Sequence, residues 1–319
     1  MPEQKLQFEN ARIVQQLYNQ EPKNLDLLKD QLGLKIITRD DWIVLEGTPE
    51  SIELGSQFFN QLESTIRSGN KIRDRDFEIA LQVLCTDGVQ VLKKLHAETL
   101  ITSPQKAPIT PKTLGQQKYI ECIREKDVVF GIGPAGTGKT YLAMAMAVTF
   151  LKQEKVSRII LTRPAVEAGE ELGFLPGDLY EKISPYLRPL HDALYDMLPA
   201  EEVQKHMQRG TVEIAPLAYM RGRTMNHSMI LLDEAQNCTT EQMFMFLTRL
   251  GHHSKAVITG DPTQIDLPQH KKSGLIEALK ALESIPEIGK VKFEKKDVVR
   301  HRLVQKIIAA YESWRGTTE

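Results

Sequence analysis

The sequence predicts an α/β protein in which a parallel β-sheet carries helices on both faces and a smaller α/β module comes first. A glycine-rich pattern at residues 133–140 lies between an apolar strand and an apolar helix. Further apolar stretches at residues 159–161, 229–232 and 256–258 end in polar or acidic residues, as parallel strands do where they line a ligand crevice. Three prolines within residues 104–111 separate this part from the N-terminal third.

Composition is that of an ordinary globular protein. The 319 residues suit two domains, and 41% hydrophobic with 26% charged residues argues against disorder. The formal net charge of −1 requires any nucleic-acid contact to come from a local patch. The three scattered cysteines form neither a disulfide framework nor a metal-binding spacing, which indicates a reducing compartment. Because no signal pattern or membrane-length apolar run is present, we expect a cytoplasmic protein without membrane contact.

The sequence of the N-terminal third predicts that this part of the chain folds as a small α/β module. A helix over residues 24–32, with Asn24 as its cap, precedes a hairpin of residues 34–38 and 42–46. A second helix opens at Thr48, followed by a proline in its preferred place. This arrangement resembles part of a KH-type RNA-binding domain but lacks a G-x-x-G loop. RNA binding and a plain structural or oligomerising role both stay open for this module.

A proline-rich segment predicts the domain boundary. Residues 77–95 have helical periodicity, and the prolines that follow can neither continue a helix nor sit in a central strand. We therefore expect an N-terminal module at residues 1–99, a linker at 100–112 and a phosphate-loop domain at 113–319.

The glycine-rich pattern fits the phosphate-binding pattern G-x-x-x-x-G-K-[ST] at every position. The candidate nucleotide-binding residues are Gly133, Pro134, Ala135, Gly136, Thr137, Gly138, Lys139 and Thr140. Glycines let successive N–H groups point at phosphate oxygens, and the following helix presents its N-terminus to the same anion. We expect Lys139 to contact the β- and γ-phosphates and Thr140 to offer its hydroxyl to Mg²⁺. The alternative, a chance glycine-rich turn, is disfavoured by the full match and its flanks.

Two carboxylates follow the apolar strand at residues 229–232. In phosphate-loop enzymes the first acid holds Mg²⁺ and the next can deprotonate the attacking water. We therefore assign Asp233 to the metal and Glu234 to the catalytic base; the alternative is a pair of acids that merely ends a strand. Gln264 lies in a polar turn after another apolar strand, from which it can hydrogen-bond the γ-phosphate or the attacking water.

Other polar residues near these strands have more open roles. Gln116, one short helix before the phosphate loop, is placed either to bond an adenine edge or simply to begin a solvated helix. Arg163 ends an apolar strand and is placed to meet phosphate or nucleic acid. We expect residues 165–210 to form a surface subdomain beside the site, and residues 219–224 to form a small basic turn at the same sheet edge.

The motifs, taken in order, resemble two related groups of proteins. The phosphate loop, Asp-Glu-Ala-Gln at 233–236 and Gly-Asp-Pro-Thr-Gln at 260–264 resemble the motifs of superfamily 1 helicase motors. Arg163 with its proline, Leu-Gly-Phe-Leu-Pro-Gly at 172–177 and Val-Val-Arg-His at 298–301 resemble the bacterial PhoH-like family.

This resemblance implies a RecA-like fold, a cytoplasmic location, binding of ATP and Mg²⁺, and an RNA-related role. It also implies that Gln116 reads adenine and that Arg300 is the late arginine of the core. Arg300 would then stabilise charge on the γ-phosphate, either in its own chain or across an interface; the alternative is a solvated basic helix start.

The part of the chain after Gln264 leads us to expect an oligomer. About 55 residues remain there, far fewer than a second motor domain needs. We therefore expect either a neighbouring protomer that completes the site, in a homo-oligomer, or an ATP-driven switch that does not translocate.

The predicted function is Mg²⁺-dependent ATP hydrolysis coupled to RNA binding, remodelling or ribosome-linked RNA metabolism. RNA-processing or ribosome-associated proteins are the expected protein partners. The first alternative is a nucleotide-gated binding switch or assembly factor without helicase activity. The second is a small-molecule kinase, against which the Asp-Glu-Ala-Gln stretch argues because a glutamate after the metal-binding acid suits hydrolysis.

Overall fold

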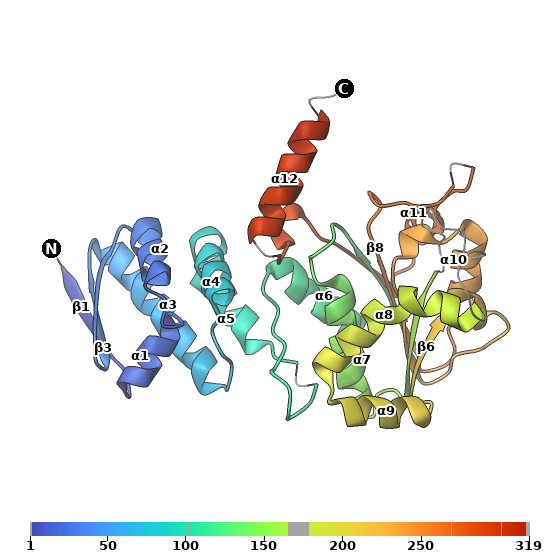
Figure 1. Cartoon of the computed structure of the whole chain (residues 1–319), viewed down its shortest axis with the longest axis horizontal. Coiled ribbons are helices and arrows are strands. Elements are labelled where there is room, and N and C mark those ends of the chain that lie inside the picture. Colours follow the sequence, from blue (N-terminus) through green and yellow to red (C-terminus); the bar gives the residue numbers. More distant parts are fainter. Residues whose placement is uncertain (1, 101, 165–178, 269, 301, 317–319) are drawn as a thin grey trace. The chain divides into compact units, whose positions relative to one another are not determined.

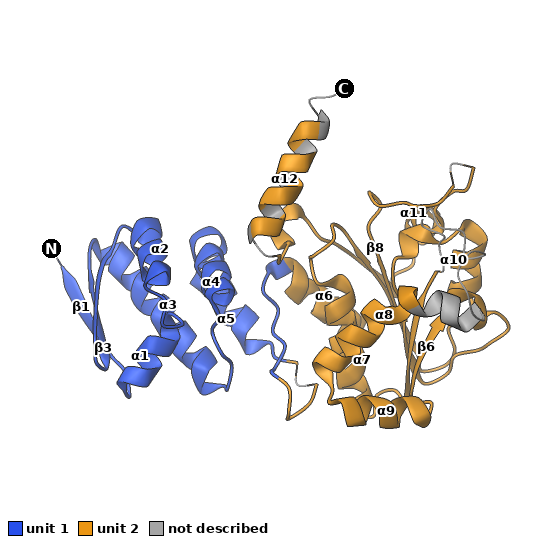
Figure 2. Ribbon diagram, in the orientation of Figure 1, with its two compact units in different colours: residues 1–99, 107–114 blue, residues 100–106, 115–319 orange. Residues whose placement is uncertain are grey.

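The structure is a computed structural model of the chain, shown in Figure 1. It describes residues 2–100, 102–164, 179–268, 270–300 and 302–316. The chain forms two compact units, residues 1–99 with 107–114 and residues 100–106 with 115–319 (Figure 2). In the described parts of the chain, no helix combines the length and apolar character needed to cross a membrane.

The first unit begins with a three-stranded antiparallel sheet in the order β1-β3-β2. Its elements follow the order βααββα and are β1 (Glu3–Gln7), α1 (Ala11–Leu17), α2 (Pro22–Leu32), β2 (Lys35–Arg39), β3 (Trp42–Glu46) and α3 (Pro49–Arg67). Two further helices, α4 (Asp74–Asp87) and α5 (Val89–Ala97), complete the unit. The small α/β module is confirmed, and its sheet is compatible with the predicted likeness to KH domains.

The predicted starts of helices and strands in the first unit are confirmed in part. The hairpin and the start of α3 are confirmed, since the Thr48 hydroxyl accepts a hydrogen bond from the Ser51 N–H at 3.2 Å. The cap predicted at Asn24 is wrong. Helix α2 begins two residues earlier, at Pro22, whose fixed φ favours the first helical turn. The buried Asn24 amide instead donates to the Tyr18 carbonyl at 3.0 Å, so it ties α1 to α2.

The helix predicted over residues 77–95 is two helices. Gly88 separates α4 from α5 with φ 85° and ψ 170°, a backbone conformation in which the helix cannot continue. Strand β1 was not predicted, because its alternation of charged and polar residues contains a single buried side chain, Leu6. Within the core of this unit, Phe58 packs edge-to-face on Phe77 with ring centroids 5.1 Å apart.

The second unit contains a six-stranded parallel sheet in the order β6-β5-β7-β8-β4-β9. The strands are β4 (Val128–Ile132), β5 (Arg158–Arg163), β6 (Val212–Pro216), β7 (Ser228–Leu232), β8 (Lys255–Gly260) and β9 (Ile288–Lys292). The helices are α6 (Leu114–Glu125), α7 (Lys139–Lys152), α8 (Leu179–Met197), α9 (Ala200–Gln208), α10 (Thr240–Leu247), α11 (Gly274–Ala281) and α12 (Arg302–Gly316). Short 3₁₀ turns occupy Leu217–Met220, Ala235–Asn237 and Lys295–Asp297.

Helices cover both faces of this sheet (Figure 1). Helices α7 and α8 pack on one face, and α10 and α11 enclose a hydrophobic core on the other, with Phe130 of β4 and Phe246 of α10 among its buried members. The predicted fold class, a RecA-like phosphate-loop core, is confirmed. Strand β9 was not predicted, because a short edge strand with two exposed lysines gives little hydrophobic signal.

The predicted surface subdomain is described in part. Its residues 165–178 lie outside the described residues, and the rest forms α8 and α9. In the basic turn after β6, both amino groups of the Arg223 guanidinium bond the Glu213 carboxylate, at 2.6 and 2.7 Å. Arg221 of the same turn is exposed.

Candidate active site

The phosphate loop joins the end of β4 to the start of α7. Its Gly133 N–H donates to the Gly260 carbonyl at 3.1 Å, which fixes the loop to the end of β8. Gly136 and Gly138 have φ values of 84° and 82°, a left-handed backbone that glycine adopts without steric cost. A Cβ atom at Gly136 would also overlap the Arg300 side chain. The loop therefore has the backbone that a phosphate cradle needs, and glycine is required to form it.

Lys139 is folded back onto this loop. Its Nζ donates to the carbonyls of Gly133 and Pro134 at 2.6 and 2.8 Å. Burial lowers the pKa of Lys139, and the nearby carboxylates of Asp261 and Glu234 oppose that shift. A bound phosphate could accept these hydrogen bonds in place of the two carbonyls. Its negative charge makes it the stronger acceptor for the Lys139 amine.

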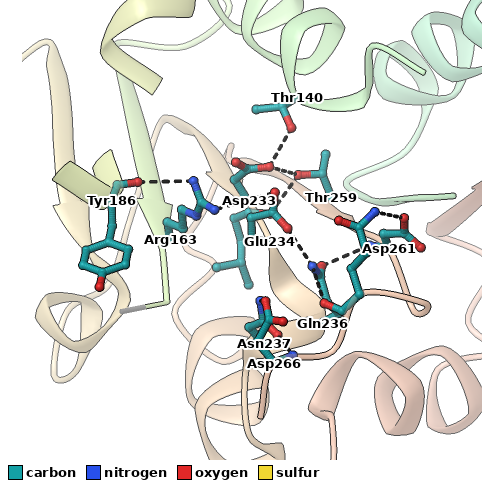
Figure 3. Close-up of polar contacts among 12 residues, drawn as sticks. Thr140, Arg163, Tyr186, Asp233, Glu234, Gln236, Asn237, Thr259, Asp261 and Asp266 are labelled. Atoms are coloured by element: carbon teal, nitrogen blue, oxygen red, sulfur yellow. Dashed lines mark hydrogen bonds and ion pairs between the residues drawn. The ribbon is translucent and has the colours of Figure 1, made fainter. Parts of the chain in front are cut away.

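The two candidate Mg²⁺ ligands already contact each other. The Thr140 hydroxyl donates to Asp233 Oδ1 at 2.6 Å, and the Thr259 hydroxyl donates to the same oxygen at 2.8 Å (Figure 3). Asp233 is buried at the end of β7, and its N–H donates to the Thr162 carbonyl at 2.9 Å. The sheet register thus sets the carboxylate against the first turn of α7.

This donor set fits Mg²⁺. Among the described residues no group of three or more His, Cys, Asp and Glu side chains could hold a metal ion. Mg²⁺ is commonly held by one or two carboxylates together with substrate phosphates and water, rather than by an all-protein cage. One hydroxyl and one carboxylate beside a phosphate cradle therefore suit Mg²⁺ bound together with a nucleotide.

Glu234 lies directly after Asp233 in a left-handed conformation, with φ 52° and ψ 39°. Such a backbone is uncommon for a residue with a side chain and is found at functional sites, where surrounding contacts hold it. Gln236 supplies one contact, since its Nε2 donates to Glu234 Oε2 at 2.6 Å. Arg163 supplies another, with Nη2 3.7 Å from Glu234 Oε1.

Gln236 also reaches the turn that carries Gln264. Its Nε2 donates to the Gln264 carbonyl at 3.1 Å, and its Oε1 accepts the Asp261 N–H at 3.0 Å. The Asp261 carboxylate in turn accepts from the Gln264 side chain at 2.6 Å. Gln236 therefore joins the candidate base to the turn that carries the candidate γ-phosphate sensor. Figure 3 shows Gln236 between Glu234 and Asp261. Neither Gln236 nor Asp261 was given a role from the sequence, although both lie within the quoted motifs.

Gln116 and Arg300 approach the phosphate loop from other elements. Gln116 is buried in α6, and its Nε2 donates to the Thr137 carbonyl at 3.0 Å. It therefore supports the loop, and adenine recognition by Gln116 stays a prediction. The Val299 N–H donates to the Gly136 carbonyl at 2.8 Å, which brings Arg300 of the same chain against the loop.

These residues line one cavity of about 310 Å³. The described residues that line it are Ala135, Gly136, Gly138, Lys139, Thr140, Tyr141, Asp233, Glu234, Gly260, Asp261, Gln264 and Arg300. The cavity thus unites the candidate catalytic residues Lys139, Glu234, Gln264 and Arg300 with both candidate metal ligands. These residues come from the ends of three strands, β4, β7 and β8, and from one late segment, which explains why no local stretch of sequence could define the site.

Comparison with known proteins agrees with the motifs. A family model described as "PhoH-like protein" matches residues 108–312. The PhoH-like protein of Bacillus subtilis is 49% identical over 296 residues, which are 93% of this chain and 93% of that protein. The PhoH-like protein of Mycobacterium bovis is 51% identical over 91% of this chain and 82% of its own length. Protein PhoH of Escherichia coli K12 is 46% identical over 77% of this chain and 68% of its own length. The chain, with its phosphate-loop NTPase core, therefore belongs to the PhoH-like protein family.

Proposed function

We propose that this protein hydrolyses ATP in a Mg²⁺-dependent reaction. The observation that carries the proposal is the single cavity lined by Lys139, Thr140, Asp233, Glu234 and Gln264. A phosphate cradle, a metal-binding pair and a carboxylate base are the parts that hydrolytic phosphate-loop enzymes require. Because these parts lie in one cavity, the structure supports ATP hydrolysis much more specifically than any single motif does.

The residues divide the reaction among them. Backbone N–H groups of the loop and the Lys139 amine bind the phosphates, and Arg300 offsets negative charge on the γ-phosphate. The Thr140 hydroxyl and the Asp233 carboxylate would hold Mg²⁺, which when bound neutralises charge on the phosphate oxygens. Glu234 accepts a proton from water as the water oxygen bonds to the γ-phosphorus and the bond to the ADP oxygen breaks. Gln264 orients that water or the γ-phosphate.

We further propose that hydrolysis is coupled to RNA. Support comes from Arg163, the last residue of β5, which lies at the carboxyl end of the parallel sheet where ligands bind. The KH-like order of elements in the first unit is a second, independent support. In this proposal the protein acts in the cytoplasm, where its ATP hydrolysis serves ribosome-linked RNA metabolism together with RNA-processing or ribosome-associated proteins.

A homo-oligomer is the proposed working form. Helix α12 exposes large apolar side chains, with Leu303, Tyr311 and Trp314 59%, 60% and 69% exposed. Exposed apolar side chains gathered on one element are typical of association surfaces. Because Arg300 lines the cavity of its own chain, the proposed association would stabilise the site without supplying this arginine.

One experiment tests these proposals together: the ATPase rate measured against protein concentration, with and without single-stranded and duplex RNA. Hydrolysis that requires Mg²⁺, rises with RNA and rises per protomer with concentration is expected. No hydrolysis under any condition would refute the enzymatic proposal. Stimulation by RNA without strand separation would favour the nucleotide-gated switch over a helicase.

A further inference from the structure

Arg163 lies where the sheet meets the candidate base. It is the last residue of β5, and the neighbouring β7 ends directly before Asp233 and Glu234. Thr162 is paired in register with Leu232, so the next residues of the two strands lie side by side at the carboxyl edge. The position of Arg163 relative to Glu234 is therefore set by the sheet itself.

The Arg163 guanidinium is shared between two partners (Figure 3). Its Nη1 donates to the Tyr186 carbonyl of α8 at 3.3 Å, and its Nη2 lies 3.7 Å from Glu234 Oε1. The second distance exceeds that of a hydrogen bond, and the Arg163 and Glu234 side chains are 23% and 37% exposed. An ion pair of this length and exposure is weak enough to be exchanged for a stronger anion.

The contact with Arg163 bears on the chemistry of Glu234. Oε2 of Glu234 accepts the hydrogen bond from Gln236, whose amide is buried and held by the Asp261 N–H. Oε1, which faces Arg163, is the oxygen left for a water molecule. A base can take a proton only from water within hydrogen-bond reach, so a guanidinium beside Oε1 competes with the reactive position of that water.

Phosphate is the anion best suited to remove Arg163 from Glu234. The planar guanidinium binds phosphate through paired, charge-assisted hydrogen bonds. The adjacent strand β6 ends at Pro216, opposite Arg163 in register, so the two strands end at the same level of the sheet. Arg163 therefore carries its charge at the carboxyl end of the parallel sheet, where ligands of such sheets bind and a nucleic-acid phosphate can be contacted.

We propose that Arg163 restrains Glu234 in the RNA-free protein and binds a backbone phosphate of single-stranded RNA in the complex. Transfer of the guanidinium from Glu234 to phosphate frees Oε1 for the attacking water, so ATP is hydrolysed fastest when RNA is bound. This inference rests on the proposed RNA-coupled ATPase and names the residue that couples the two ligands.

The test compares Arg163→Gln with wild type and with Arg158→Gln in the full-length protein. Arg158 is the first residue of the same strand, at the end of β5 away from Glu234, so its variant controls for the loss of one arginine from β5. Steady-state ATPase rates are measured without RNA and with a saturating single-stranded oligouridine, and oligouridine affinity is measured by fluorescence anisotropy. Thermal melting verifies folding, and Arg163→Lys, which keeps the charge but loses the paired geometry, serves as the second variant.

Arg163→Gln is expected to raise the RNA-free rate about fivefold, the factor equivalent to about 1 kcal/mol, and to lose further stimulation by RNA. It should also weaken oligouridine binding, whereas Arg158→Gln should match wild type. Arg163→Lys should have an RNA-free ATPase rate and an oligouridine affinity that lie between those of wild type and Arg163→Gln.

An RNA-free rate at or below that of wild type, together with retained stimulation, would overturn the restraint while leaving the RNA-coupled ATPase standing. Wild-type protein that hydrolyses ATP without any response to RNA would instead refute the coupling itself. A raised rate in Arg163→Gln with unchanged oligouridine affinity would overturn RNA phosphate as the ligand of Arg163.

Discussion

Gln236 offers the sharpest test of how the site is held together. Its side chain is buried and makes hydrogen bonds to Glu234, to the Gln264 carbonyl and to the Asp261 N–H. Gln236→Leu removes all three bonds at similar volume. Gln236→Glu keeps an oxygen for the Asp261 N–H but loses both donated bonds and sets a second carboxylate beside Glu234.

The size of the effect follows from these contacts. Gln236→Leu leaves the Asp261 N–H buried without an acceptor, which costs about 1–3 kcal/mol. Because the Glu234 side chain is 37% exposed, water replaces much of the lost bond to its carboxylate, which adds only about 1 kcal/mol. The free energy of unfolding should therefore fall by about 2–4 kcal/mol. A base that is no longer fixed should lower kcat by about 10- to 100-fold, within the range attributed to a positioned base.

Urea unfolding and steady-state ATPase kinetics measure both quantities. In Gln236→Glu the loss of stability should be smaller than in Gln236→Leu, because the Asp261 N–H keeps its acceptor, while kcat should still fall. Affinity for ATP should stay near that of wild type in both variants, since Gln236 does not line the cavity among its described residues. A Gln236→Leu protein with the kcat of wild type would refute the view that this residue positions Glu234.

Two further predictions concern Lys139 and His96. Lys139→Ala should abolish ATP binding in equilibrium binding measurements. The variant lacks the amine that bonds the Gly133 and Pro134 carbonyls and that would bond the phosphates of bound ATP. Unchanged affinity for ATP would contradict the assignment of Lys139 to the phosphate site. Burial, with Lys112 as a smaller cause, lowers the pKa of His96 in the first unit to about 4, from 6.5. Since the folded-state pKa is the lower one, His96 contributes full stability above pH 6.5 and loses up to about 3 kcal/mol as the pH falls to 4. His96→Gln should flatten the dependence of unfolding free energy on pH in that window, and a pH dependence identical to that of wild type would contradict this assignment.

The grouping of the candidate catalytic residues was predictable because each of them follows a strand. Lys139, Asp233 and Gln264 each come after an apolar run, and carboxyl ends of parallel strands meet at one edge. Meeting of these residues in one cavity follows from that rule without any knowledge of strand order. The same rule predicted Arg163 beside the site, and its Nη2 lies 3.7 Å from Glu234 Oε1, while its contact with phosphate stays a prediction.

Contacts between the motifs could not be predicted in the same way. That Thr259 shares Asp233 Oδ1 with Thr140 depends on β8 lying between β4 and β7, which sequence patterns do not specify. The role of Gln236 depends likewise on the approach of the turn at Gly260 to the end of β7. The error at Asn24 has another origin, since a proline two residues earlier competed with it for the helix start.

Glu234→Gln tests the hydrolytic assignment most directly, with ATP affinity and single-turnover hydrolysis measured on the same protein. Glutamine has the shape of glutamate and retains an oxygen for the hydrogen bond from Gln236, so the site should keep its structure and bind ATP with unchanged affinity. It cannot take a proton from water, so hydrolysis should fall by about 10²- to 10⁴-fold. Near-normal hydrolysis by the Glu234→Gln protein would contradict the account.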